Sequence, residues 1–348
     1  MWQPRVSVLM TTWNGAAFIG VSIGSVLAQS FADFELIVVD DGSTDEAVAV
    51  IEAIDDPRVR LLRMPQNGGI VAARNAGFAI AGGTYIAALD HDDLADPERL
   101  ARQVIFLDAN PAVVLVGTEI RIDDNGTLRV PDHHRAGDGL AMGWQLLIDN
   151  PLTWSSVMFR AEAVRRLGVF MRGDFEPADD FDFYHRMLAL GDVARLDEVL
   201  TTYRYHGGNA SLVSADRLNR NAARVLAGAY APWLGQSSMV AAELVVRHLS
   251  DRRPMRDRAT LLRLGEILEA LLAGYSVGHR LLGADVARVA VIAGQAWWRC
   301  VRASVRSGSP WLIGAYGQPR VLAAAFRPDW RDVVISVGVG SVRRLLRR

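Results

Sequence analysis

Three acidic residues directly follow a short apolar run in the first third of the chain. Asp90, Asp92 and Asp93 come after Tyr85–Leu89, which has the composition of a buried strand. Carboxylates this close repel one another unless a cation joins them, and a hard divalent cation with oxygen ligands is the usual one. Because such an ion is commonly shared with the phosphates of a nucleotide, the cluster indicates phosphate-linked chemistry. The alternative is a solvated acidic turn that also caps the next helix.

A second acidic pair, Asp40 and Asp41, also follows a predicted strand. Gly42 permits a sharp turn after the pair, and Ser43 or Thr44 is expected to cap the helix that follows. Capping alone would explain one acid at the end of a strand. Two strands of one sheet that both end in paired acids indicate a shared crevice.

The elements that must position these acids alternate along the amino-terminal part of the chain. The predicted strands are Val6–Met10, Glu35–Val39, Arg58–Arg63 and Tyr85–Leu89, and the predicted helices are Ala16–Gln29, Thr44–Ile54 and Ile70–Ala81. Strands that alternate with helices in this way indicate parallel βαβ units with right-handed crossovers. Open α/β sheets hold ligands at the carboxyl ends of their strands, where the acids lie. The sequence therefore predicts an α/β fold.

Six short motifs follow one another between Val6 and Ser211. They are Val6–Asn14, Val39–Ser43, Asn67–Gly69 with Ala73–Gly77, Asp90–Asp92, Ala178–Asp182 and Tyr203–His206. In this order they resemble the motifs of the inverting family 2 glycosyltransferases, which are nucleotide-sugar-dependent enzymes with the GT-A fold. The resemblance implies a Rossmann-like, mainly parallel sheet flanked by helices in residues 1–215. Residues 1–110 would bind the nucleotide sugar and residues 111–215 the acceptor.

The resemblance also implies roles for the residues near a metal. Asp92 would bind a divalent cation, Mn²⁺ or Mg²⁺, and Asp90 would help directly or through water. His206 would complete the metal shell or touch the diphosphate. The alternative for His206 is a loop histidine packed on Tyr203 or Tyr205.

For the nucleotide, the resemblance implies that Asp41 accepts a hydrogen bond from the imide N–H of uracil, with Thr11 beside the same ring. Arg74 would clamp a phosphate or a base edge, and a solvated helix arginine is the alternative. Asp40 would fix the turn.

On the acceptor side, the resemblance places the general base at Asp180, the second acid of a pair. This chain has Asp179 where the family often has glutamate, which shortens the side chain and keeps the charge. In the predicted helix 180–190, Asp182 is expected to pair with Arg186 four residues on. The run 154–159 reads as a strand, and Trp154 at its mouth would either stack on a sugar or join the core.

Composition excludes several other classes of protein. The chain has 348 residues and half of them are apolar, which suffices for one large core and an appended smaller region. It contains no lysine, which removes the lysine-dependent P-loop and any Schiff-base mechanism. The single cysteine, Cys300, rules out an internal disulfide, and the near-neutral charge gives no sign of nucleic-acid binding. We expect no signal peptide and a cytoplasmic location.

Residues 216–348 are expected to form a helical region, because they are helix-forming and rich in alanine, leucine, valine and arginine. Residues 299–348 contain ten arginines but only two acids, Asp329 and Asp332, and tryptophans occur in and just before this segment at Trp297, Trp298, Trp311 and Trp330. No apolar stretch is long enough to span a bilayer. The pattern predicts peripheral contact of residues 299–348 with anionic lipid on the inner face of the cytoplasmic membrane. A helical cap or an oligomerisation surface is the alternative.

The expected function is non-processive, inverting transfer of a sugar from a nucleoside diphosphate, expected to be UDP, to a hydroxyl acceptor. The resemblance places it in bacterial-type assembly of cell-surface polysaccharide or glycolipid. A catalytically inactive nucleotide-sugar-binding partner or regulator is the alternative, and the presence of both Asp92 and Asp180 favours the enzyme. A nucleotidyltransferase would prefer a glycine-rich first loop with a basic residue, which Thr11–Asn14 does not offer.

Overall fold

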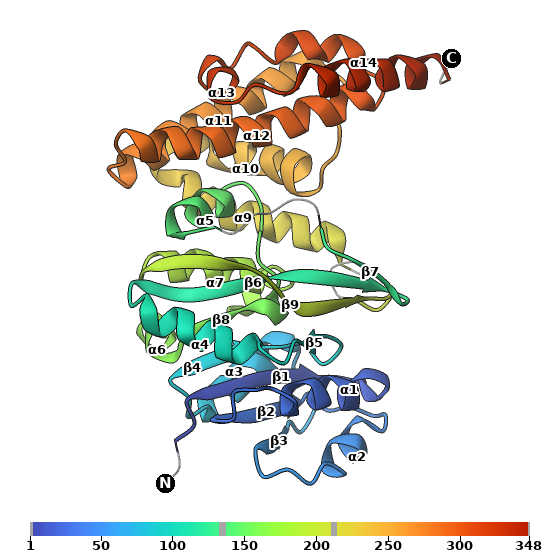
Figure 1. Cartoon of the computed structure of the whole chain (residues 1–348), viewed down its shortest axis with the longest axis vertical. Coiled ribbons are helices and arrows are strands. Elements are labelled where there is room, and N and C mark those ends of the chain that lie inside the picture. Colours follow the sequence, from blue (N-terminus) through green and yellow to red (C-terminus); the bar gives the residue numbers. More distant parts are fainter. Residues whose placement is uncertain (1–2, 132–136, 210–213, 347–348) are drawn as a thin grey trace. The chain divides into compact units, whose positions relative to one another are not determined.

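The computed structural model describes residues 3–131, 137–209 and 214–346, and the chain divides into two compact units. Unit 1 comprises Met1–Gly143 and Pro151–Leu218, and it is built of strands and helices. Unit 2 comprises Trp144–Asn150 and Asn219–Arg348, and it is helical (Figure 1). Ser211, at the end of the stretch that resembles family 2, lies outside the described residues.

The first half of unit 1 confirms the predicted alternation. It contains β1 (Val6–Thr12), β2 (Phe34–Asp40), β3 (Val59–Arg63) and β4 (Tyr85–Ala88), connected by α1 (Ala16–Leu27), α2 (Ala47–Glu52) and α3 (Ile70–Ile80). The strands run parallel in the order β3-β2-β1-β4. Every residue of β1, β2 and β4 is buried, as continuous strand runs in a helix-covered parallel sheet require.

The predicted cap of α2 is wrong. Helix α2 begins at Ala47, and the Asp45 carboxylate accepts the N–H of Ala47 at 3.0 Å. The side chain of Ser43 instead contacts the loop between β1 and α1, where its hydroxyl accepts the N–H of Asn14 at 2.9 Å. The expected sharp turn at Gly42 is present, because this residue has φ +72°.

Beyond β4 the sheet becomes mixed. Its other strands are β5 (Leu94–Ala95), β6 (Val113–Asp124), β7 (Thr127–Arg129), β8 (Met158–Arg160) and β9 (Asp192–Tyr205), and the order continues β4-β8-β6-β9-β5, with β7 on β6. Strand β8 is antiparallel to both β4 and β6, whereas β6 and β9 are parallel. The predicted parallel arrangement therefore holds for the strands β3-β2-β1-β4, and antiparallel pairs occur in the rest of the sheet.

The strand expected over 154–159 forms only at its end. Its first three residues make the 3₁₀ turn η1 (Trp154–Ser156), because both the N–H and the hydroxyl of Ser156 donate to the carbonyl of Thr153, at 2.9 and 2.8 Å. Strand β8 then begins at Met158. Trp154 is therefore drawn into the interior rather than placed at a strand mouth.

The core of unit 1 lies between the sheet and its helices. The remaining elements of this unit are α4 (Arg99–Ala109), α6 (Ala161–Leu167), η2 (Gly173–Phe175) and α7 (Asp179–Leu188), and α5 (Gly139–Leu146) belongs to it in part. Alternate residues of β1 and β2 pack with Ile19 and Ile23 of α1 and with Leu100, Val104 and Leu107 of α4. This packing fixes the strand ends that carry the acidic residues.

Unit 2 is organised around one long, amphipathic helix. Its elements are η3 (Gly235–Ser237), α10 (Ser238–Val245), the π-helical turn η4 (Val246–Ser250), α11 (Arg258–Gly278), α12 (Ala284–Arg306), η5 (Pro310–Ala315), α13 (Arg320–Ala325) and α14 (Trp330–Leu345), together with most of α9 (Ala215–Leu234). Helix α12 contacts α11, α13, α14 and η5, and its Trp297 is fully buried with Nε1 donating to the carbonyl of Tyr316 at 3.0 Å. Among the described residues, no helix combines the length and the apolar character needed to cross a membrane.

Candidate functional site

Neighbouring parallel strands bring the first predicted site residues to one edge of the sheet. Thr11 lies opposite Val39 in the β1–β2 ladder, and Asp41 follows β2 directly. Both side chains are largely buried. Asp90 comes two residues after β4, on the other side of β1. The structure therefore brings Thr11, Asp41 and Asp90 to the same edge.

Asp41 holds the glycine loop through both of its carboxylate oxygens. Oδ1 accepts the N–H of Gly68 at 2.8 Å, and Oδ2 accepts the N–H of Gly69 at 2.9 Å. Each oxygen retains a lone pair, so the predicted contact with a base stays chemically open. Asp40 accepts the N–H of Ser43 at 3.3 Å and so fixes the turn after β2.

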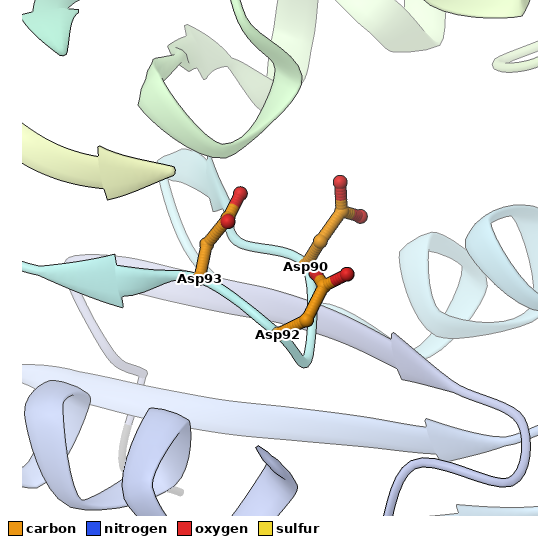
Figure 2. A group of neighbouring side chains, drawn as sticks. All are labelled: Asp90, Asp92 and Asp93. Carbon is orange, nitrogen blue, oxygen red and sulfur yellow. The ribbon is translucent and has the colours of Figure 1, made fainter. Parts of the chain in front are cut away.

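The acidic cluster occupies the turn between β4 and β5. Figure 2 shows the side chains of Asp90, Asp92 and Asp93 extending to the same side of this turn. Each offers one oxygen, and these oxygens lie within 4.8 Å of one another. Ser155, which lies outside the cluster, stabilises the turn: its hydroxyl accepts the N–H of Asp90 at 3.0 Å.

Asp93 is the most deeply placed of the three. Its Oδ1 accepts the N–H of Arg204 at 2.9 Å, while its Oδ2 is buried without a hydrogen-bond partner among the described residues. Burial raises the pKa of Asp93 well above its ordinary value, and the charges of Asp92 and Asp90 raise it further. Burial also raises the pKa of Asp90, although Arg74 opposes the change.

These three carboxylates fit a hard divalent cation. The donor set is entirely oxygen, the charges repel one another, and one buried oxygen lacks a partner. Asp93 was not among the predicted site residues. Its signal in the sequence was its place as the third acid within four residues.

His206 reaches the cluster from the far end of β9. Its Nε2 lies 2.9 Å from Oδ2 of Asp92, and its ring stacks on Phe18 with centroids 4.8 Å apart. The ring therefore packs on a residue of α1, which the loop-histidine alternative did not predict. The two residues predicted to hold a metal thus lie together, and their role as ligands stays a prediction.

Arg74 of α3 is buried between two carboxylates. One guanidinium nitrogen donates to Oδ2 of Asp179 at 2.7 Å, and the other donates to Oδ1 of Asp90 at 3.2 Å. The guanidinium also lies 4.2 Å from the ring centroid of Trp154. Arg74 is therefore no solvated helix arginine, and Trp154 is a core residue under it. Sequence reasoning had not predicted Asp179 as the partner of Arg74.

The acids of the predicted base segment open helix α7. Asp180 is partly exposed at this helix start, and its Oδ1 accepts the N–H of Phe181 at 2.7 Å. Carboxylates are stabilised at the positive end of a helix. Asp182 is buried and accepts from Nε of Arg186 at 2.8 Å, which confirms the predicted pair.

Helix α3 also holds the segment that precedes α7. The side chain of Asn75 donates to the carbonyl of Met171 at 3.0 Å and accepts the N–H of Met171 at 2.9 Å. Adjacent residues of α3 therefore fix Met171 and Asp179. The position of Asp180 depends on both contacts.

Comparison with known proteins agrees with this geometry. The model of glycosyl transferase family 2 matches residues 7–168. An uncharacterized glycosyltransferase of Haemophilus influenzae is 28% identical over 237 residues, which are 64% of this chain and 72% of the relative. The succinoglycan biosynthesis protein ExoO of Rhizobium meliloti is 43% identical over 113 residues, or 32% of each chain.

The fold resembles that of a solved structure. The crystal structure of S. aureus TarS 1–349 in complex with UDP-GlcNAc aligns with a TM-score of 0.55 and 17% identity, over 99% of this chain and 91% of that one. The sheet of unit 1 is therefore of the GT-A type. Residues 7–168 therefore belong to glycosyl transferase family 2.

The site has two acidic halves, and the guanidinium of Arg74 joins them. Asp90, Asp92 and Asp93 form an anionic half on the turn after β4, and Asp179 and Asp180 form a second at the start of α7. Arg74 touches both halves. The arrangement suits an enzyme that must hold a donor and an acceptor next to each other.

Proposed function

We propose that this chain is an inverting, non-processive glycosyltransferase that moves a sugar from a nucleoside-diphosphate donor to a hydroxyl acceptor. UDP is the proposed nucleotide. The observation that carries the proposal is the buried bridge Asp90–Arg74–Asp179, because it sets an acidic cluster suited to a metal beside an acid suited to proton removal. The succinoglycan function in the name of ExoO and the UDP-GlcNAc bound by TarS support this choice.

The donor would lie at the carboxyl edge of β1, β2 and β4. Asp41 and Thr11 would contact the base there, with the glycine loop held in place by Asp41. Arg74 would add positive charge near the phosphates while it keeps Asp90 in position. Asp90, Asp92, Asp93 and His206 would hold a divalent cation, Mn²⁺ or Mg²⁺. When bound, this ion would neutralise charge on the departing diphosphate.

The acceptor hydroxyl would lose its proton to Asp180. In an inverting transfer the hydroxyl attacks the face of the sugar opposite the leaving group, so the base must lie across the sugar from the diphosphate. The start of α7 favours the ionised carboxylate, which can accept the proton as the new bond forms. Asp179, held by Arg74, would position this turn of the helix.

The proposed pathway is bacterial-type assembly of cell-surface polysaccharide or glycolipid. The proposed location is the cytoplasm, with peripheral contact on the inner face of the cytoplasmic membrane through residues 299–348. The excess of arginine in this segment supports that location. Arg347 and Arg348 of this segment lie outside the described residues.

A panel of nucleotide sugars tests the proposal. The full chain is incubated with each donor and Mn²⁺, and both binding and slow hydrolysis of the donor are measured. We expect one or a few donors to bind and to release nucleoside diphosphate. Donor binding without hydrolysis or transfer to any saccharide acceptor would favour the inactive binding partner instead, and an absence of donor binding would contradict both.

A further inference from the structure

Helix α14 turns its apolar residues outward. Trp330, Val334, Ile335, Val342 and Leu345 are each more than half exposed. At about 100° per residue they fall within an arc of about 140° on the helix. We call these five residues the outer face of α14. A surface helix of a globular protein ordinarily places such a stripe against the core, so the pattern here is inverted.

The inner side of α14 explains the inversion, because it packs through polar and small residues. Asp332 accepts from Nε1 of Trp298 at 3.0 Å and from Arg306 at 2.8 Å, and Ser336 accepts from Nε of Arg306 at 2.9 Å. A Cβ on Gly340 would overlap the carbonyl oxygen of Val305, so the two helices touch by their backbones. These contacts with α12 fix the rotation of α14 and leave the outer face without cover in the described part of unit 2.

Positive charge and exposed tryptophan accompany the outer face. The exposed arginines of α13, α14 and the connection between them are Arg320, Arg327, Arg331, Arg343 and Arg344. The guanidinium of Arg344 lies 4.7 Å from the ring of Trp311, which is half exposed. Asp329 and Asp332, the two acids of residues 299–348, do not lie on the outer face. Asp332 faces α12, and Asp329 caps the start of α14 by accepting the N–H of Arg331.

We propose that the outer face of α14 binds the surface of an anionic lipid bilayer. Apolar side chains with flanking arginine and tryptophan are the features of helices that lie in the bilayer interface. Charge selects lipid over a second copy of this chain, because a symmetric pair would bring the same arginines together, whereas anionic headgroups neutralise them. The inference rests on the proposed peripheral membrane location and assigns it to a defined face.

The test compares variants of the full chain for binding to vesicles. The vesicles contain either phosphatidylcholine alone or phosphatidylcholine mixed with phosphatidylglycerol, and binding is followed by co-sedimentation. The first variant is Ile335→Glu with Val342→Glu, which places acids on the outer face. The control is Leu282→Glu, at an apolar residue between α11 and α12 that is even more exposed than Ile335 and Val342.

We expect the natural chain and the Leu282→Glu control to bind the mixed vesicles more tightly than pure phosphatidylcholine. The double variant should bind the mixed vesicles at least about tenfold more weakly. If the acidic pair disturbs folding, Ile335→Ser with Val342→Ser provides a milder version, and circular dichroism monitors the fold of each variant.

Three outcomes would overturn the proposal. The first is a natural chain that does not bind mixed vesicles, and the second is a folded double variant that binds them as tightly as the natural chain. The third is a dimer in sedimentation analysis that the double substitution dissociates, which would assign the outer face to a second copy. Nucleotide-sugar binding in the absence of vesicles is measured in parallel. A natural chain that binds no nucleotide sugar would contradict the proposed transferase function, independently of the lipid result.

Discussion

Arg74 and Asp179, 105 residues apart in the sequence, are joined by a buried hydrogen bond of 2.7 Å. The bond links α3, which follows the glycine loop, to the first residue of α7. The same guanidinium reaches Asp90 at 3.2 Å. Burial opposes the positive charge of Arg74, but Asp179 and Asp90 outweigh it, so the pKa of this guanidinium is raised. Arg74 therefore stays charged in the interior and fixes the two acidic halves of the site.

Replacement of Arg74 tests the strength of this bridge. Arg74→Gln should lower the free energy of unfolding by about 3 kcal/mol, because it leaves two carboxylates without their buried partner. Chemical denaturation of Arg74→Gln, Asp179→Asn and the double variant measures the coupling. We expect the double variant to lose at least about 1 kcal/mol less than the sum of the single losses. Strictly additive losses would mean that the two residues stabilise the fold separately.

Replacement of Asp92 tests the acidic cluster. Asp92→Asn should weaken Mn²⁺ binding by about tenfold or more and abolish divalent-dependent turnover, because one ligand oxygen loses its charge. Calorimetric titration with Mn²⁺ measures the affinity without reference to activity. Asp33→Asn, at an exposed acid outside the cluster, serves as the control and should bind Mn²⁺ normally. Equal Mn²⁺ affinity in both variants, or full activity in EDTA, would make the cluster structural.

The sequence predicted most of the fold but only part of the site, and the reason is the range of the interactions. Strand and helix periodicity is local, so the βαβ order and the gathering of Asp41 and Asp90 at one edge were predictable. The partnership of Arg74 with Asp179 depends on chain packing across the unit, and no local pattern encodes it. The turn at Trp154 was missed because a hydroxyl contact of Ser156 overrode the strand-like composition.

Glu35 on β2 gives unit 1 a defined acid sensitivity. Burial alone would raise its pKa, but the Ser7 hydroxyl at 2.6 Å, the Gly82 N–H at 2.9 Å and Arg60 outweigh burial and lower the pKa below 4.5. A carboxyl with a lowered folded-state pKa stabilises the fold fully above its unfolded-state pKa. That contribution is lost as the pH falls through the folded-state pKa.

Glu35→Gln should therefore lower the free energy of unfolding by about 1–3 kcal/mol at neutral pH. The difference from the natural chain should shrink as the pH falls below 4.5. Urea denaturation at a series of pH values measures this difference. A difference that stays constant down to acid pH would show that the carboxylate charge contributes nothing and that only the shape of the side chain matters.

Replacement of Asp180 tests the proposed base. Asp180→Asn removes the proton acceptor but keeps the size of the side chain and its place at the start of α7. Turnover should fall by about 10²-fold or more, while the dissociation constant of the donor barely changes, because the base acts on the acceptor. Single-turnover transfer and donor titration measure the two quantities separately.

Asp179→Asn distinguishes a base from a positioning residue. Asp179 is bound to Arg74 and buried, whereas Asp180 is partly exposed at the same helix end. Loss of the Asp179 charge should disturb stability and donor binding together, since Arg74 is then free to shift from Asp90. If Asp179→Asn abolishes turnover with donor binding intact and Asp180→Asn does not, the base is the first acid of the pair. If neither variant changes turnover, the start of α7 does not supply the base, because the third acid of this first turn, Asp182, is buried and bound to Arg186.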